Sequence, residues 1–334
     1  MTEFLNALVA FSNFVLIPSS VYGAQLALGA LGVTLIYGIL RFANFAHGDM
    51  MAFGAMFVIL GTWWLQSKGI NAGVLPTALI ALPFGILMAI GLALITDRTV
   101  YRFYRRVRAA PVVFTIVSVG VMFMYNGIIR IVIGTDDQRF GDGERFIMRA
   151  RDFKEMTGLN EGLAIKTSQV LTLVIAVMVV AALFWFLQKS RTGKAMRAYS
   201  DNEDLALLSG INPDRVVMVA WIIAAALATI AGTLYGLDKT YKPFIFMQLL
   251  LPIFASAVVG GIGQPIGAIA GGFVIAFSET TVTYSYKKVA SYLGYEGDAL
   301  LQLLSVEYKF AVSFVILVLV LLIRPTGLFR GKTI

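Results

Sequence analysis

Long apolar stretches recur along this chain, and they limit its fold more than any other feature of the sequence. A helix needs about 20 apolar residues to cross the hydrocarbon core of a bilayer, where lipid offers no hydrogen-bond partner to an open backbone. The chain is 58% hydrophobic and 14% charged, which excludes a soluble globule of its size. The apolar stretches are residues 21–40, 50–65, 75–95, 111–133, 169–187, 216–237, 249–260, 266–284 and 310–323. We predict an all-α fold, a polytopic transmembrane bundle of about 8–10 membrane segments with broken or re-entrant helices.

Residues 1–334 are expected to form one transmembrane domain. Its first apolar stretch, residues 4–17, is short and is followed by Pro18. We therefore predict an interfacial or short spanning helix that ends at the proline. No basic leader and no small-residue cleavage site accompany it, so we expect this segment to be retained.

Charged residues are distributed unevenly among the polar connections. If successive connections alternate between the two sides of the membrane, one side holds 14 of the 27 Lys and Arg residues and 6 of the 19 Asp and Glu residues. The difference equals the whole net charge of +8. By the positive-inside rule this side, with residues 96–110 and 189–214, faces the cytoplasm, while residues 134–168 face outward. Topology and anionic lipid account for the basic residues, so no nucleic-acid partner is predicted.

The polar connection 189–214 is predicted to be a cytoplasmic docking element. Residues 191–199 are expected to form one short helix, and Ser200 or Asp201 to cap a second helix that stops at Gly210. Apolar side chains three residues apart share a helical face, and acids near the N-terminus are favoured by the helix dipole. The residues predicted to contact a soluble partner are Arg197, Asp201, Glu203, Asp204, Leu205, Leu208 and Gly210. An ordinary solvated loop is the alternative.

Two breaks interrupt the apolar stretches, at RFANFAHGD (residues 41–49) and in the glycine-rich residues 260–272. Each leads into a helix of small residues, which hints at a duplicated transporter and points to the substrate path. The predicted path residues are Asn44, Ala46, His47, Gly48, Gly260, Gly261 and Gly263. An architectural role is favoured for the polar members: Asp49 would cap a helix beginning at Met50, and His47 would satisfy nearby carbonyls.

Polar residues near the ends of spans are expected to be paired or to snorkel. Arg130 and Glu279 are the main examples, and we place both near the outer interface. A proton relay through them is the less favoured interpretation.

No cofactor or metal site is predicted in this chain, and no enzymatic activity. The sequence has no cysteine and one histidine, which excludes thiolate and histidine-rich metal sites. The segment GLFRGKT (residues 327–333) has three residues between its glycines where a phosphate-binding loop has four. The segment GIGQPIG (residues 261–267) likewise does not have the spacing of a dinucleotide-binding loop.

Five segments in this order resemble the LivH-type integral permeases of branched-chain amino acid ABC transporters. They are residues 32–55, VYRFYRRVRAAP (100–111), residues 193–236, VVGGIGQPIGAIAGG (258–272) and LLIRPTGLF (321–329). The resemblance covers residues 29–328 and implies an importer of the bacterial inner membrane. It also implies four kinds of partner: a second homologous permease, two cytoplasmic ATPases that hold ATP and Mg²⁺, a periplasmic substrate-binding protein, and membrane lipid.

In that family, the segment that matches residues 194–210 looks like the coupling motif that sits in a groove of the ATPases. The chain departs from the family pattern at residues 238–252 and 298–309, which puts the substrate in doubt. Branched-chain amino acids are the expected cargo, and urea, short amides or aromatic acids are alternatives.

The residues do not favour two other functional classes. A secondary transporter driven by an ion gradient usually places an acid or a histidine deep in the membrane, and this chain offers few candidates. An intramembrane hydrolase needs a nucleophile and a base within reach of each other, which a chain without cysteine and with one histidine at a break does not favour.

Overall fold

The structure, a computed structural model, describes residues 2–294, 297 and 301–329, and that part is mostly helical with almost no strand. Its elements are α1 (Thr2–Phe11), η1 (Ser12–Leu16), α2 (Ile17–Leu40), α3 (His47–Ser67), α4 (Ala78–Thr96), η2 (Asp97–Tyr101), α5 (Arg102–Arg106), α6 (Pro111–Ile133), β1 (Phe146–Met148), α7 (Ala150–Thr157), β2 (Ile165–Lys166), α8 (Thr167–Lys189), α9 (Arg191–Asp201), α10 (Glu203–Leu208), α11 (Pro213–Asp238), α12 (Ile245–Gly260), α13 (Pro265–Thr283), α14 (Lys287–Tyr292), η3 (Val306–Tyr308) and α15 (Lys309–Ile323).

Eight helical stretches in the described residues are long and apolar enough to span a membrane, and α12 is a shorter apolar helix. The only sheet in this part of the chain is the antiparallel pair of β1 and β2. The prediction of an all-α, polytopic bundle with about 8–10 segments is therefore confirmed. Part of the misspaced GLFRGKT segment and part of residues 298–309 lie outside the described residues.

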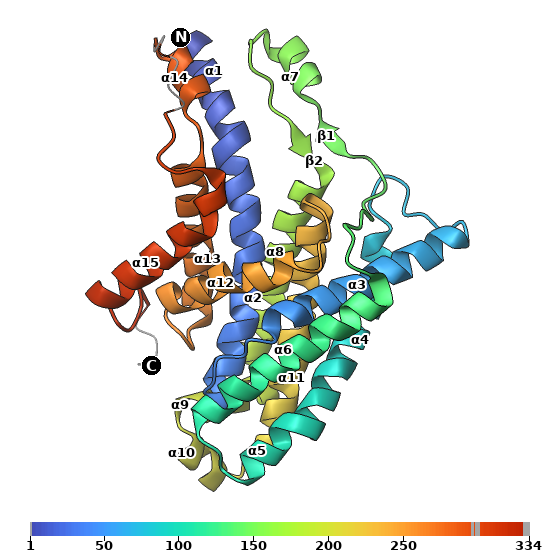
Figure 1. Cartoon of the computed structure of the whole chain (residues 1–334), viewed down its shortest axis with the longest axis vertical. Coiled ribbons are helices and arrows are strands. Elements are labelled where there is room, and N and C mark those ends of the chain that lie inside the picture. The colour runs from blue at the N-terminus through green and yellow to red at the C-terminus, as the bar shows by residue number, and fades with distance from the viewer. Residues whose placement is uncertain (1, 295–296, 298–300, 330–334) are drawn as a thin grey trace.

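The bundle is built around α2, which is buried along nearly its whole length. Helices α8, α11, α12 and α13 pack directly on it, while α3 and α4 pack on α11, and α3 also contacts α12. Figure 1 shows α7, β1 and α14 at one end of the long axis, which we call the α7 end. The opposite end, which carries α5, α9 and α10, we call the α10 end.

The N-terminal helix differs from the prediction. Instead of ending at Pro18, α1, η1 and α2 form one continuous helical stretch of 39 residues. The π-turn of η1 explains this, because the Ile17 N–H donates to the Ser12 carbonyl five residues back. This wider turn directly precedes Pro18 and accommodates its ring, which in a regular α-helix would clash with the carbonyl four residues earlier.

The arginine-rich connection is also helical, since η2 and α5 extend α4 without a break. Asp97 accepts hydrogen bonds from the Arg105 guanidinium at 2.9 Å and from Trp221 Nε1 at 2.8 Å. Arg102 forms an ion pair with Asp214 at 3.4 Å. Asp97 and Arg102 therefore hold η2 and α5 against α11, and Arg105 fixes the Asp97 carboxylate within the same helical stretch.

Small residues allow the helices to approach one another closely. Gly272 of α13 lies against α2, where an added Cβ would be 2.7 Å from the backbone nitrogen of Ala27. In a membrane such close packing replaces the hydrophobic driving force between helices, because lipid is as apolar as the side chains. The contact between α2 and α13 therefore depends on a glycine at this position.

We expect Gly272→Ala to destabilise the bundle by about 1–3 kcal/mol, because α2 and α13 would have to separate. Gly120→Ala is the matched control, since Gly120 is a helical glycine with no atom within 4 Å of an added Cβ. Thermal unfolding of the two purified variants in detergent, followed by tryptophan fluorescence, measures the difference. Equal melting temperatures for both variants would show that the close contact is not required.

Candidate functional site

The first predicted break lies inside the bundle. Helix α2 ends because Arg41 adopts a left-handed backbone conformation with φ 57°, and the Arg41 guanidinium donates a hydrogen bond to the Ser200 carbonyl of α9. Asn44 and Ala46, which follow, are each only 2% exposed. Non-helical backbone at membrane depth is stable only where protein groups surround and satisfy it.

Neighbouring side chains satisfy this break. Asn44 Oδ1 accepts hydrogen bonds from the Ala46 N–H at 3.2 Å and from the Tyr101 hydroxyl at 3.4 Å. The Phe45 N–H donates to Ser118 Oγ of α6 at 3.0 Å. Asn44 thus holds the turn in place, as the architectural interpretation of the break requires.

The next two predicted path residues begin α3. The His47 side chain is fully buried and its ring lies against Gly32 of α2, where an added Cβ would be 2.6 Å from His47 Cε1. The Gly29 carbonyl also lies near the His47 ring. Among the described residues, however, neither imidazole nitrogen of His47 forms a hydrogen bond of normal geometry. Gly48 faces α12, where an added Cβ would be 2.5 Å from the Phe246 carbonyl oxygen. These residues occupy the seam between α2, α3 and α12.

The predicted role of Asp49 as a helix cap is wrong in detail. Helix α3 begins at His47, so Asp49 lies within its first turn and Ala46 occupies the capping position. Asp49 Oδ1 accepts a hydrogen bond from Asn126 Nδ2 of α6 at 2.9 Å. The carboxylate therefore joins α3 to α6. It lies in the first turn of α3, where the positive end of the helix dipole stabilises a negative charge.

The two residues expected near the span ends are paired. Arg130 lies in the last turn of α6, with its guanidinium 4.1 Å from the centre of the Phe244 ring. Glu279 is fully buried in α13 and forms an ion pair with Lys309 at 3.6 Å, while the Ser313 hydroxyl donates to it. Pairing, not snorkelling, is the outcome for Glu279.

The second break is a tight turn between α12 and α13. Gly261 and Gly263 both have positive φ, at 110° and 85°. Gly260 packs against α13 so closely that an added Cβ would be 1.9 Å from the Gly267 carbonyl oxygen. The Phe329 N–H donates to the Gly260 carbonyl at 3.1 Å, so residues 328–329 cover this turn.

The structure does not place the two breaks against each other. The first break packs on the middle of α12, where Phe45 and Phe254 have ring centroids 5.5 Å apart. The glycine turn lies at the end of α12 and borders α9 instead. Gly263 lines a pocket of about 290 Å³ together with Arg197 and Asp201. One residue predicted for the path and two predicted for coupling therefore meet at the α10 end.

The predicted docking element is a pair of short helices. Ser190 caps α9 by accepting a hydrogen bond from the Gly193 N–H at 2.8 Å. Asn202 caps α10 by accepting from the Leu205 N–H at 3.0 Å. The predicted caps Ser200 and Asp201 are wrong, because α9 continues through both and the extended backbone needed for a cap occurs one residue later.

The predicted apolar ridge of this element is on the surface of the described chain. Leu205 is 61% and Leu208 85% exposed, whereas Ala206 between them is buried. Gly210 has φ 80°, the left-handed conformation predicted for the residue that ends α10. Arg197, Asp201, Glu203 and Asp204 are exposed around the ridge. The Tyr199 hydroxyl donates a hydrogen bond to Glu203, which joins α9 to α10. Burial of the Tyr199 side chain, and to a lesser extent this hydrogen bond, raise the pKa of Tyr199.

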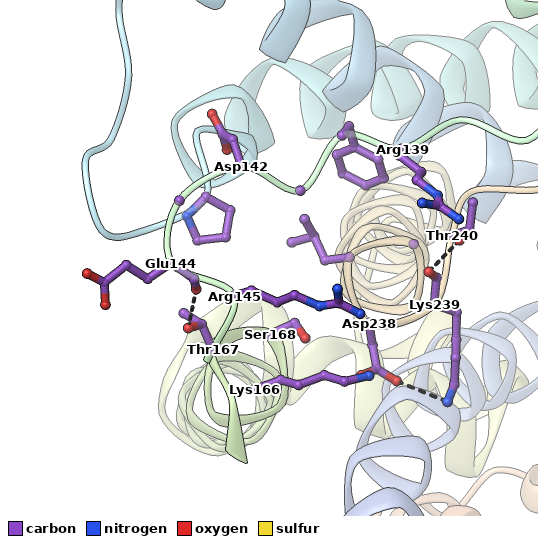
Figure 2. A pocket seen from close by; sticks show the side chains of 16 residues that line it. Arg139, Asp142, Glu144, Arg145, Lys166, Thr167, Ser168, Asp238, Lys239 and Thr240 are labelled. Atoms are coloured by element: carbon purple, nitrogen blue, oxygen red, sulfur yellow. Dashed lines mark hydrogen bonds and ion pairs between the residues drawn. The ribbon is translucent and has the colours of Figure 1, made fainter. Parts of the chain in front are cut away.

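A further pocket, not predicted from the sequence, opens at the α7 end and has a volume of about 350 Å³ (Figure 2). Residues 139–145, 166–168 and 236–240 form most of its wall. The first two segments belong to the outward-facing connection between α6 and α8 and the start of α8, and the third is the end of α11 with the residues that follow it. Their only signal in the sequence is the concentration of charge beside the span ends.

Within residues 2–294, 297 and 301–329, no group of three or more His, Asp or Glu residues could hold a metal ion. The candidate site therefore consists of a buried break, a glycine turn and an exposed helix pair, with a separate pocket at the opposite end.

Comparison with known proteins identifies the family. The family model described as "Branched-chain amino acid transport system / permease component" matches residues 15–321. The chain is 30% identical over 312 residues to the high-affinity branched-chain amino acid transport system permease protein LivH of Escherichia coli K12, covering 92% of this chain and 91% of that protein. It is 28% identical over 309 residues to the BraD permease protein of Pseudomonas aeruginosa, covering 92% of each chain.

A more distant relative is the probable branched-chain amino acid transport permease protein LivH of Methanocaldococcus jannaschii, with 27% identity over 314 residues and coverage of 92% of this chain and 89% of that one. Among solved structures, PsaBC from Streptococcus pneumoniae in complex with Fab is 12% identical, with a TM-score of 0.47 over 97% of this chain and 96% of the other. That similarity is too low to support a conclusion. The full-length match and the relatives above show that this chain belongs to the branched-chain amino acid transport permease family.

Proposed function

We propose that the chain is the integral membrane permease subunit of an ABC importer that moves branched-chain amino acids across a bacterial inner membrane. The observation that carries the proposal is the match along nearly the whole chain to proteins named as high-affinity branched-chain amino acid transport permeases. In this proposal two cytoplasmic ATPase subunits bind ATP and Mg²⁺. A second homologous permease and a periplasmic substrate-binding protein complete the transporter.

The whole chain, residues 1–334, serves as one transmembrane domain with the α10 end in the cytoplasm. The excess of Lys and Arg in the connections at this end supports the orientation. The connection 189–214 then lies inside the cell and residues 134–168 lie outside. Exposed apolar residues on the outer helices, such as Trp185 at 68% and Leu322 at 76% exposure, support contacts with lipid or with the second permease.

The α9–α10 pair couples the bundle to the ATPases. Leu205 and Leu208 form an exposed apolar ridge that fits a groove on a soluble partner. Behind the ridge, α9 packs on α8 so closely that a Cβ at Gly193 would be 2.3 Å from the Phe186 carbonyl oxygen. A rigid pair held this way transmits displacement to the helices behind it, with Arg41 as a second link to the first break.

The substrate path runs along the seam of α2, α3 and α12 beside the first break, and past the glycine turn. Small residues on α2 and the unpartnered nitrogens of His47 support this assignment. Asn44, Ala46, His47 and Gly48 line one part of the path, and Gly260, Gly261 and Gly263 line the other. In the structure side chains fill the seam at His47, so substrate passes only after the helices separate.

The chain, expressed with its partner subunits in a bacterium that lacks high-affinity uptake of these substrates, should restore uptake of radiolabelled leucine, isoleucine and valine. Uptake should stop with the ATPase inhibitor vanadate and persist when the proton gradient is collapsed, because ATP drives the cycle. Restored uptake of urea, acetamide or benzoate in place of leucine would assign the alternative substrates. Leucine uptake that needs the gradient and ignores vanadate would instead indicate a secondary transporter.

We expect Leu205→Asp to abolish uptake and co-purification of the ATPases while the permease still inserts in the membrane, because a charge in an apolar groove loses the contact. Met156→Asp is the matched control: Met156 is 79% exposed on a short helix at the opposite end. Affinity purification from membranes and uptake assays measure both effects. If an inserted Leu205→Asp variant shows wild-type uptake, the α9–α10 pair does not couple the bundle to the ATPases and is only a solvated connection.

If the first break lines the path, a cysteine in place of Ala46 should become accessible to a small water-soluble thiol reagent during transport. Modification should be about tenfold faster with ATP and substrate-loaded binding protein than without them, and should block uptake. Ala89→Cys, also fully buried but in α4, is the control and should stay unreactive. The natural absence of cysteine makes the background clean. If the cysteine at position 46 stays unreactive throughout turnover, the first break does not line the substrate path.

A further inference from the structure

The pocket at the α7 end has walls that are fixed to one another. Asp142 accepts hydrogen bonds from the Thr77 N–H at 2.7 Å, the Thr77 hydroxyl at 2.6 Å and Gln66 Nε2 at 2.9 Å. Burial alone would raise the pKa of Asp142, but these hydrogen bonds outweigh burial and lower it. The Thr167 N–H donates to the Arg145 carbonyl at 3.1 Å, which ties the wall to α8. Hydrogen bonds therefore hold the walls of the pocket in place, and the Asp142 carboxylate is part of the wall.

A buried carboxylate with an unused oxygen lies in this pocket. The Asp238 side chain, at the end of α11, is only 6% exposed, and its Oδ2 is 3.5 Å from Lys239 Nζ. Asp238 Oδ1 has no hydrogen-bond partner among the described residues. A buried acceptor left unpaired costs free energy, so this oxygen favours a ligand that donates hydrogen bonds.

Basic side chains face the same space. Figure 2 shows Arg145 and Lys166 extending toward Asp238, while Glu144 is directed away from the pocket. In the part of the chain that the structure describes, neither Arg145 nor Lys166 forms an ion pair.

Arg139 and Lys239 also line the pocket, and Lys239 is paired with Asp238. The Arg145 guanidinium lies 5.4 Å from the centre of the Phe146 ring, a contact with the face of the group that leaves its N–H edge for a ligand. Arg145 and Lys166 are therefore available for a carboxylate, and a guanidinium can bind one with two hydrogen bonds.

The remaining wall includes three apolar residues, Pro76, Phe140 and Leu237. Phe140 is only 4% exposed, so it forms a fixed surface. The volume of about 350 Å³ lies in the range of small-molecule sites. The pocket thus combines a carboxylate with one unpaired oxygen, basic side chains and an apolar surface.

We propose that this pocket binds a free amino acid with an aliphatic side chain. The ammonium group donates to Asp238, the carboxylate accepts from Arg145 and Lys166, and the side chain lies on Phe140 and Leu237. An inorganic anion would leave Asp238 Oδ1 without a donor, and a simple cation would leave Arg145 and Lys166 without an acceptor, whereas a zwitterion serves both. The inference rests on the proposed function and adds to it a site that receives the substrate at the outer end, before the path opens.

The test uses the complete transporter in nanodiscs, without the binding protein, and radiolabelled L-leucine as the probe. L-Leucinamide lacks the carboxylate and isocaproate lacks the ammonium group, so both should compete at least about tenfold more weakly than L-leucine. Asp238→Asn should weaken leucine binding about tenfold and leave competition by isocaproate unchanged. Arg145→Gln should weaken leucine binding to a similar extent and leave competition by leucinamide unchanged.

Asp152→Asn is the control, since Asp152 is an exposed acid of α7 at the same end. It should bind leucine like the wild type. Arg145 is exposed in a connection, so its variant tests the site even if Asp238→Asn fails to fold. Wild-type leucine affinity in both Asp238→Asn and Arg145→Gln would overturn the inference. If the wild-type transporter takes up leucine but no leucine binds in nanodiscs, the pocket assignment fails and the proposed function stands; if uptake itself is absent, the proposed function fails.

Discussion

The whole architecture depends on one constraint: lipid cannot form hydrogen bonds with an open backbone. Wherever a helix stops inside the bundle, another part of the protein must satisfy the exposed groups. At residues 41–46 the partners come from Asn44, Tyr101 and Ser118. At the glycine turn they come from residues 328–329, which lie more than sixty positions further along the chain. Each break is therefore held by distant elements, and a movement of either partner disturbs the break.

This dependence gives the coupling proposal a physical route. Arg41 ends α2 and also binds the Ser200 carbonyl, so the end of α2 and α9 share one hydrogen bond. Gly263 borders the same pocket as Arg197 and Asp201 of α9. A displacement of α9 thus reaches the first break through the Arg41 hydrogen bond and changes the pocket that borders the second. Packed helices respond to such a displacement by shifting between discrete arrangements, because dense interiors deform little.

The parts of the fold that sequence could predict are those set by composition and local pattern. The lengths of the apolar stretches predicted the spans. The residue that ends α10 was predicted at Gly210 because glycine adopts a positive φ without strain. The errors have two causes. Pro18 is tolerated because the turn before it is a π-turn, a local geometry that apolar length and a proline do not reveal. Asp49 does not cap α3 and instead binds Asn126 of α6, a partner that the local sequence does not contain. The pocket at the α7 end was missed for the same reason, since its three walls meet only after folding.

The continuous helix from Thr2 to Leu40 sets the geometry of the protein in its bilayer. Its 39 residues correspond to a length of about 58 Å, whereas the hydrocarbon core is about 30 Å thick. At a tilt of about 40°, the upper limit for membrane helices, it still extends through about 44 Å, which is the thickness with headgroups included. Its apolar first turns, with Phe4 61% exposed, then lie at headgroup level. Because α2 is the centre of the bundle, it cannot tilt alone, so any tilt that relieves the mismatch of this one helix must be shared by the helices packed on it.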